Sequence, residues 1–230
     1  MNKNIPNLII VEGYNDKSFF ERVCKRYKIN SNITIGTPVD YIPSSQGGFN
    51  SKQGVINSLD LFLPMLEDED SSIKKIAIII DSDIEGENNG GFKSTIELIK
   101  NKTQEYEYSG KHEYKNGGIE IPHSDRRMNP LKIWIMPNNK DDGTVENWIK
   151  NKIIDSEKDI FSHACKVVAA LKDKKFSQHA VVKAEIATWL AWQNQPGRTV
   201  GYTLKEGNEL IDVNNSEFKG FINWLKDFAK

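Results

Sequence analysis

Carboxylates follow two apolar runs of the chain, and they are the residues best suited to do chemistry. Residues 8–11 (LIIV) lead into Glu12, and residues 76–80 (IAIII) lead into Asp81 and Asp83. Carboxylate oxygens are the ligands that Mg²⁺ takes in proteins, and a carboxylate can also carry a proton to or from a reacting oxygen. The two groups therefore predict a divalent-cation site with a proton-transfer group beside it.

The apolar runs before these carboxylates are typical of strands covered on both faces. Neither face of such a run is polar, as in a parallel α/β sheet, so the carboxylates must emerge at the carboxyl ends of the strands. Open α/β sheets bind their ligands at this edge. We expect Glu12, Asp81 and Asp83 to converge there, and without metal their mutual repulsion should raise the pKa of at least one.

Asp81 and Asp83 are predicted to hold the cation, and Glu12 is predicted to be the catalytic residue. In a chain still extended at the strand end, residues i and i+2 point to one side, so both aspartates would face one ion. The simpler alternative is that short acidic residues close a strand and cap the next turn. Glu12 would transfer a proton. Its alternative roles are a third metal ligand and a residue before a helix N-terminus.

Five further residues are weaker candidates. Glu85 is predicted as another metal ligand, with Glu87 or plain solvent exposure as alternatives. Asp142 and Glu146 follow a later predicted strand, so they are candidates for a second metal or for substrate, although both also suit a helix N-terminus. Lys17, near the start of the first predicted helix, is a candidate contact to a substrate phosphate or a solvated charge.

Strands and helices alternate over about two-thirds of the chain, and the remainder has helical periodicity. This predicts an α/β domain over residues 1–155 and a helical C-terminal extension over 156–230. Residues 101–118 are polar and are interpreted as a surface insertion. The predicted strands are 8–11, 76–80, 119–121 and 131–136, and residues 33–35 and 39–42 together are predicted to supply a second strand or a hairpin. The predicted helices are 15–27, 52–66, 92–100, 144–153, 161–171, 180–192 and 218–228.

Composition limits the class of protein. The chain has 31 basic and 32 acidic residues, a net charge of −1, so any polyanion would be held by a local patch or through a metal. Two cysteines are too few for a disulfide framework and suggest a reducing cytoplasm. The sequence shows no signal peptide and no apolar run near the roughly 20 residues that cross a bilayer, so no membrane partner is expected.

Two acidic motifs carry a specific resemblance. Residues 11–16 (VEGYND) resemble the first motif of the TOPRIM superfamily, the catalytic module of topoisomerases, bacterial primases and overcoming-lysogenization-defect nucleases. Residues 81–86 (DSDIEG) match the DxDxxG form of its second motif. The resemblance implies a Rossmann-like, mostly parallel sheet sandwiched by helices. It also implies Mg²⁺ or Mn²⁺ as cofactor, Glu12 as the proton-transfer group and Glu85 as the third acidic position.

A broader resemblance covers most of the chain. Residues 134–139 and 143–146, followed by 183–192 and 196–197, resemble a prokaryotic family of TOPRIM-like proteins catalogued only as a domain of unknown function. These patterns are less specific than the two acidic motifs. They imply a fold more firmly than an activity.

The function predicted from these observations is Mg²⁺- or Mn²⁺-dependent hydrolysis of phosphodiester bonds in nucleic acid, either DNA or RNA. No tyrosine nucleophile of topoisomerase type and no zinc module of primase type is apparent. One alternative is a small-molecule phosphotransferase or phosphatase of the haloacid-dehalogenase type, although such enzymes place an aspartate where this chain has Glu12. The other is a noncatalytic binding module.

Overall fold

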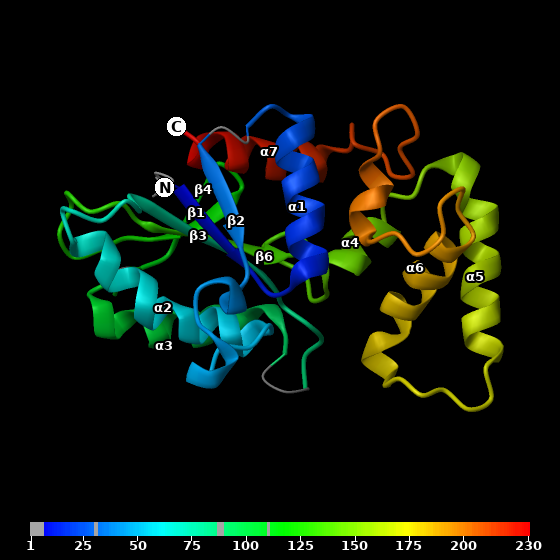
Figure 1. Ribbon diagram of the computed structural model, residues 1–230, viewed down its shortest axis with the longest axis horizontal. Helices are drawn as coiled ribbons and strands as arrows, with labels where there is room; N and C mark the ends of the chain where they lie inside the picture. The colour runs from blue at the N-terminus through cyan, green and yellow to red at the C-terminus, as the bar shows by residue number, and fades with distance from the viewer. Residues whose placement is uncertain (1–6, 30–31, 87–89, 110) are drawn as a thin grey trace.

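A six-stranded sheet forms the centre of the protein (Figure 1). The computed structural model describes residues 7–29, 32–86, 90–109 and 111–230. The strands are β1 (Asn7–Val11), β2 (Ile33–Gly36), β3 (Lys75–Asp81), β4 (Glu113–Lys115), β5 (Gly118–Ile121) and β6 (Leu131–Met136). Their order is β2-β1-β3-β6-β5-β4. Neighbouring strands from β2 to β6 pair in parallel, and β5 pairs antiparallel with both β6 and β4. The predicted α/β class and mostly parallel sheet are confirmed.

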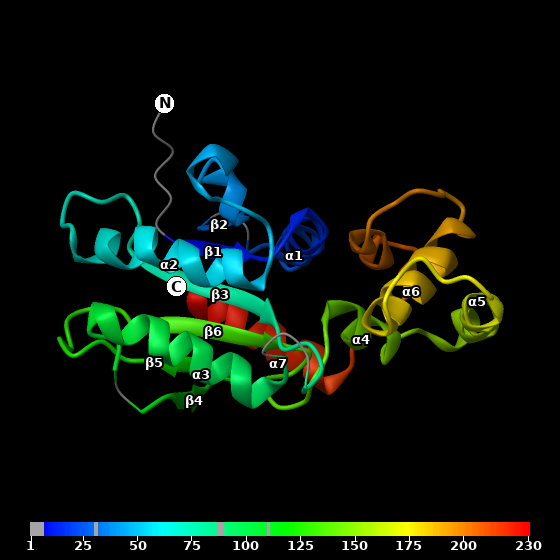
Figure 2. The ribbon, with the colours of Figure 1, turned by 90° about the horizontal axis from the view of Figure 1, so that it is seen from below.

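Helices cover both faces of this sheet (Figure 2). The α-helices of the described residues are α1 (Tyr14–Arg26), α2 (Lys52–Glu67), α3 (Phe92–Thr103), α4 (Val145–Lys150), α5 (Lys158–Ala170), α6 (Val181–Ala191) and α7 (Ser216–Phe228), of which α1, α2, α3 and α7 lie on the sheet. Alternate residues of each strand point to opposite faces. Ile9 and Ile79 accordingly pack with α1 and α7, whereas Ile10 and Ile78 pack with α2 and α3. Both sets are fully buried, which is why the strand sequences are aliphatic throughout.

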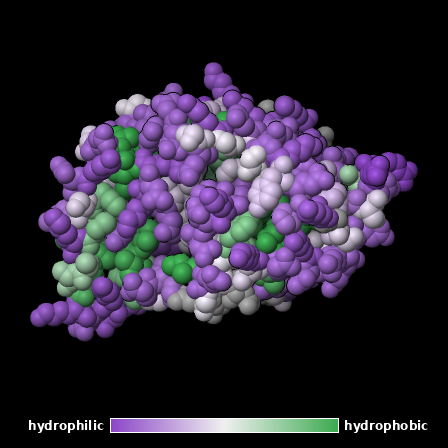
Figure 3. All heavy atoms as spheres, turned by 180° about the vertical axis from the view of Figure 1, so that it is seen from behind, coloured by the Kyte–Doolittle hydropathy of each residue, from purple (hydrophilic) through white to green (hydrophobic). Residues whose placement is uncertain are grey.

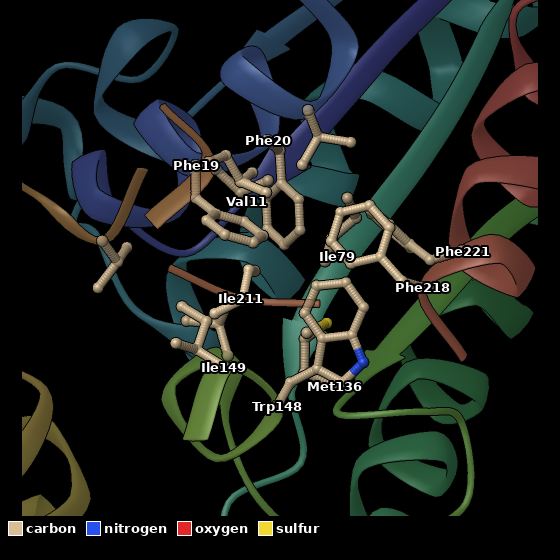
Figure 4. Close-up of a cluster of buried hydrophobic side chains, with 14 of the residues drawn as sticks. Val11, Phe19, Phe20, Ile79, Met136, Trp148, Ile149, Ile211, Phe218 and Phe221 are labelled. Carbon is tan, nitrogen blue, oxygen red and sulfur yellow. The ribbon is translucent and has the colours of Figure 1, made fainter. Parts of the chain in front are cut away.

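Aromatic side chains fill the layer between the sheet, α1, α4 and α7 (Figure 4). The ring of Trp148 stacks on Phe218 with 5.0 Å between centroids and 12° between planes. Phe221 lies 5.4 Å from Phe20 and 5.7 Å from Trp148. α7 thus covers the sheet face directly, although it is the last helix of the chain. This packing also fixes the start of α4, which contributes to the candidate site.

α5 and α6 lie beyond α4, away from the sheet (Figures 1 and 2). An ion pair of 2.7 Å between Lys150 and Glu185 ties α6 to α4. The indole of Trp189 donates a hydrogen bond of 2.9 Å to Glu157. Phe161 and Trp189 belong to the same buried cluster as α1 and α7, so one core continues across residue 155. The division into 1–155 and 156–230 stays a prediction.

The structure differs from two sequence predictions about local structure. Residues 39–42 form no strand, because a 3₁₀ turn, η1 (Pro38–Asp40), occupies this segment, with the Thr37 amide donating to the Asp40 carboxylate at 2.8 Å. The segment 101–118 is more than a surface insertion. It contains the end of α3, the turn η3 (Gln104–Tyr106), β4 and Tyr108, which is 1% exposed and donates to the carbonyl of Asn129. Tertiary contacts rather than composition order this polar segment.

The face of the molecule in Figure 3 is mostly hydrophilic. Large exposed apolar side chains such as Tyr14 and Ile84 are scattered over several elements. None of the helices in the described part of the chain is long and apolar enough to span a membrane.

Candidate functional site

The carboxyl ends of β1 and β3 bring Glu12 and Asp81 together. The two strands are parallel neighbours in which Val11 pairs with Ile79. The backbone amide of Asp81 donates a hydrogen bond of 2.8 Å to Oε1 of Glu12. Asp83 lies close enough to raise the pKa of Glu12 by repulsion. Glu12 and Asp81 therefore meet at the predicted edge, and convergence of all three carboxylates on one ion stays a prediction.

The loops after β3 and β6 are joined, and this positions the start of α4. The amide and carbonyl of Asp83 pair with those of Gly143 at 3.0 and 2.9 Å, and the Gly143 amide also donates to Oγ of Ser82. Gly143 has φ +143°, and a Cβ atom there would lie 3.1 Å from the side chain of Asn147. Glycine therefore suits this bridge. As a result, the first amide of α4, on Val145, donates to Oδ1 of Asp81 at 3.0 Å.

Asp83 does not point the way that the spacing predicted. β3 ends at Asp81, and Asp83 is left-handed with φ +58°, so the assumption of an extended chain through both residues is wrong. The Asp83 carboxylate is 48% exposed and pairs with Nζ of Lys52 at 2.5 Å. Lys52 is itself mostly buried and also donates to the carbonyl of Ser82. The two aspartates therefore have different neighbours: a helix N-terminus for Asp81 and a lysine for Asp83.

Two more carboxylates complete the cluster, Asp16 from the first turn of α1 and Glu146 from the first turn of α4. Glu146 is 6% exposed and accepts a hydrogen bond from the Thr144 hydroxyl at 2.9 Å. Its charge raises the pKa of both Asp16 and Asp81. Glu146, which the sequence placed as a second-metal or substrate candidate, thus lies at the predicted edge.

Burial is the main reason that these carboxylates hold protons more tightly than usual. It raises the pKa of Glu12 from 4.5 to about 7, with Asp83 and Asp16 adding repulsion against the opposing hydrogen bond from Asp81. Burial, followed by repulsion from Glu146, raises the pKa of Asp16 to about 6. Burial and then Glu12 raise the pKa of Asp81 well above its ordinary value. The predicted shift is confirmed, but desolvation exceeds mutual repulsion as its cause.

Lys183 of α6 brings positive charge to this cluster from the helical part of the chain. Partial burial lowers its pKa, but the carboxylates outweigh that effect and the net pKa is raised. Glu146 contributes most among them, followed by Asp81. The ion pair between Lys150 and Glu185 holds α6 in place. Residues 156–230 therefore contribute to the same site as the sheet.

The remaining predicted residues lie at the margin of the site. Asp142 accepts hydrogen bonds from the amides of Glu85 at 3.1 Å and Phe92 at 2.7 Å, so its carboxylate closes the loop after β3 against α3. Glu85 is exposed. Lys17 pairs with Asp40 at 2.8 Å. Glu87, the alternative to Glu85, lies outside the described residues.

The donor set fits a hard divalent cation in chemistry, but it is not gathered around one point. The side chains are carboxylates, which suit Mg²⁺ and Mn²⁺. Within the described ranges, no group of three or more His, Cys, Asp or Glu side chains is arranged to hold a metal ion. The contact of Asp83 with Lys52 contributes to this, because an ammonium group takes the position beside that carboxylate.

Residues 6–230 match the family described as "Protein of unknown function (DUF3226)". The chain belongs to this family. No curated protein and no solved structure matches the chain.

Sequence reasoning missed three members of the DUF3226 site: Asp16, Lys52 and Lys183. Asp16 follows Glu12 by four residues at the start of a predicted helix, so its place at the sheet edge was open to inference. Lys52 begins the helix after the second strand, another position at the carboxyl edge. Lys183 had no local signal, because only the packing of α6 on α4 brings it to the carboxylates.

Proposed function

We propose that this protein hydrolyses phosphodiester bonds of nucleic acid in a Mg²⁺- or Mn²⁺-dependent reaction. The observation that carries the proposal is the pair of Glu12 and Asp81, joined by a hydrogen bond of 2.8 Å at the carboxyl edge of a parallel sheet. Perturbed carboxylates at such an edge are typical of catalytic sites. The hydrogen-bonded pair also holds Glu12 at a fixed position relative to the loop that carries Asp83.

The charge balance of the site favours a cation. Five carboxylates face two lysines: Glu12, Asp16, Asp81, Asp83 and Glu146 against Lys52 and Lys183. A divalent ion would offset much of the remaining negative charge. Asp81 and Asp83 would hold it, and when bound it would neutralise charge on a phosphoryl oxygen and lower the pKa of a water. Lys52 would have to give up its contact with Asp83.

Glu12 is suited to move a proton near neutral pH. Its pKa of about 7 leaves both the protonated and the ionised form populated, the condition under which general acid–base catalysis is most effective. Oε1 is occupied by the amide of Asp81, and among the described residues no hydrogen bond involves Oε2. Oε2 is therefore the atom at which a proton would be taken from or given to a reacting oxygen.

A TOPRIM-like catalytic domain is part of the proposal. Glu12 follows β1, Asp81 and Asp83 follow β3, and these two strands are parallel neighbours. This arrangement agrees with the order of the two acidic motifs that the resemblance rests on. The helices on both faces support a Rossmann-like architecture in the same way.

A cleavage assay tests the proposed function. Labelled single- and double-stranded DNA and RNA would be incubated with the protein in Mg²⁺, Mn²⁺ or EDTA, beside a general phosphatase substrate. We expect cleavage of a polynucleotide with metal, no cleavage in EDTA and none by Asp81→Asn. Asp159→Asn, which changes an exposed carboxylate of α5, serves as the matched control and should keep full activity. Phosphatase activity without nuclease activity would replace this proposal by the small-molecule one.

One observation favours a second candidate, a noncatalytic binding module. The ion pair of Lys52 with Asp83 satisfies one of the two predicted metal ligands from within the protein. Lys52→Ala separates the two candidates. In a metalloenzyme the variant should bind Mn²⁺ at least as well as the wild type, because a competing cation is gone. If neither the wild type nor Lys52→Ala binds Mn²⁺, the protein is a noncatalytic binding module.

A further inference from the structure

A basic groove runs along the outer side of α1, next to the candidate site. It has a volume of about 570 Å³ and lies between α1 and the turn η6 (Val200–Leu204). Figures 1 and 2 both show η6 (orange) beside α1 (blue). Nine residues line the groove: Ser18, Glu21, Arg22, Lys25, Arg26, Lys28, Leu204, Lys205 and Glu206.

Positive charge is in excess in this groove, and most of it is unpaired. Five of the lining residues are basic and two are acidic. Arg26 pairs with Glu209 at 2.5 Å. No acidic group of the described residues lies within ion-pair distance of Arg22, Lys25 or Lys205, nor of Lys28. Arg22 and Lys25 are exposed and available to an anion.

The walls of the groove are held together by direct contacts. The hydroxyls of Ser18 and Thr199 are 3.0 Å apart, in hydrogen-bond distance. Gly201 packs so closely on α1 that a Cβ atom there would lie 3.0 Å from the carbonyl oxygen of Ser18. Leu204 is 2% exposed and forms part of the floor. The groove is therefore a preformed feature of the fold.

A second basic cavity does not have these properties. It measures about 270 Å³ and includes Lys115, Lys132 and Lys230. Each of these lysines is paired with a carboxylate of the same cavity, either Glu120 or Asp227. A fourth lysine of this cavity, Lys75, has no ion pair among the described residues, whereas four basic side chains of the groove along α1 have none, so the groove offers an outside anion more unpaired charge.

We propose that the groove between α1 and η6 binds the phosphate backbone of a polynucleotide and leads it to the carboxylates at the start of α1. Delivery of the polynucleotide to these carboxylates rests on the proposed function. From Ser18 to Arg26, the last residue of α1, the helix axis advances about 12 Å, the rise of about three to four nucleotides of a B-form strand. α1 starts two residues after Glu12, so a strand in the groove ends at the acidic edge.

Binding is tested apart from cleavage. Fluorescence anisotropy in EDTA would compare labelled 20-nucleotide single strands and duplexes of DNA and RNA. The groove variant Arg22→Glu/Lys25→Glu/Lys205→Glu is matched by Lys172→Glu/Lys174→Glu/Lys175→Glu, which makes the same charge change on the exposed loop between α5 and α6. Far-UV circular dichroism and thermal melts would verify that both variants fold.

The groove variant should raise Kd for a polynucleotide at least 10-fold and make the dependence of log Kd on log salt concentration shallower by about 2 to 3. The loop variant should change Kd less than 2-fold. Equal weakening by both variants, or none by the groove variant, would overturn the proposal. Binding to anionic phospholipid vesicles in place of polynucleotides would also overturn it and assign the groove to a membrane surface.

Cleavage in Mg²⁺ separates this proposal from the proposed function. If the wild type binds through the groove but never cleaves, the groove stands and the nuclease proposal fails. If the wild type cleaves and the groove variant keeps its kcat/KM, the nuclease proposal stands and the groove is wrong. If both the groove proposal and the nuclease proposal are correct, the kcat/KM of the groove variant falls, mainly because its KM rises.

Discussion

The two edges of the parallel strands handle charge in opposite ways. At the amino edge, Lys132 lies 3.0 Å from Glu120 and 2.5 Å from Asp227. The hydrogen bond from Lys132 is the main cause that lowers the pKa of Asp227. At the carboxyl edge, burial raises the pKa of Glu12 to about 7, and nearby carboxylates add to it. One edge pairs its charges, whereas the other leaves carboxylates short of positive partners.

This difference separates a structural network from a functional site. Paired groups at the amino edge stabilise the ionised forms and therefore the fold. Uncompensated carboxylates at the carboxyl edge lower the stability of the fold. Proteins keep such groups where a ligand or a reaction needs their charge.

Removing the central cation of the amino edge should have the largest effect. Lys132→Met leaves Glu120, which is 7% exposed, and Asp227 with only the more distant and exposed Lys115 and Lys230, so we expect a loss of about 3 kcal/mol in the free energy of unfolding. Urea denaturation measures it. Lys115→Met, which removes a 60% exposed lysine 3.6 Å from the same Glu120, is the control and should cost less than about 1 kcal/mol. Equal costs would mean that the amino edge is no network.

The pH dependence of stability should run in the opposite direction at the carboxyl edge. The Glu12 carboxyl ionises near pH 4.5 when unfolded and near pH 7 when folded, so between these values the folded state binds more protons. The free energy of unfolding should therefore fall as pH rises through this window, by up to about 3 kcal/mol from this group. Denaturation of Glu12→Gln between pH 4 and 8 should show a flatter profile, whereas Asp159→Asn should keep the wild-type profile. A profile unchanged by Glu12→Gln would contradict the shift.

Kinetics should distinguish proton transfer from metal binding within the carboxyl edge. Glu12→Gln keeps the shape of the side chain and removes its titration, so turnover should fall about 100-fold, or about 2.7 kcal/mol in transition-state stabilisation. Asp83→Asn should weaken the metal instead. A Mn²⁺ titration of oligonucleotide cleavage should partly rescue Asp83→Asn and leave Glu12→Gln inactive. Equal rescue would make Glu12 a metal ligand.

Added metal should give the smallest effect. A cation at ten times its Kd stabilises the folded state by about 1.4 kcal/mol, which corresponds to a rise of roughly 3 to 6 °C in Tm for a chain of this length. Thermal melts with millimolar Mg²⁺ measure the rise, and Asp81→Asn should abolish it. A Tm that does not respond to Mg²⁺ or Mn²⁺ would leave the carboxyl edge without a cation.

The buried strands β1 and β3, and the place of the first carboxylates after them, could be predicted from the sequence alone. Residues 8–11 and 76–80 are aliphatic on both faces, which only a sheet covered by helices can bury. Glu12 and Asp81 follow these runs, so their place at the carboxyl edge was predictable. Such predictions succeed because periodicity and strand-end position are local properties of the chain.

Only the tertiary structure decided which charges meet and how each is held. The left-handed backbone of Asp83 depends on its pairing with Gly143, a residue 60 positions away. Lys52 and Lys183 reach the site because α2 and α6 pack where they do. Electrostatic energies depend on distance and on burial, and both are set by contacts between elements far apart in sequence. The types of residue at the site were therefore readable in advance, whereas their pairing and their pKa values were not.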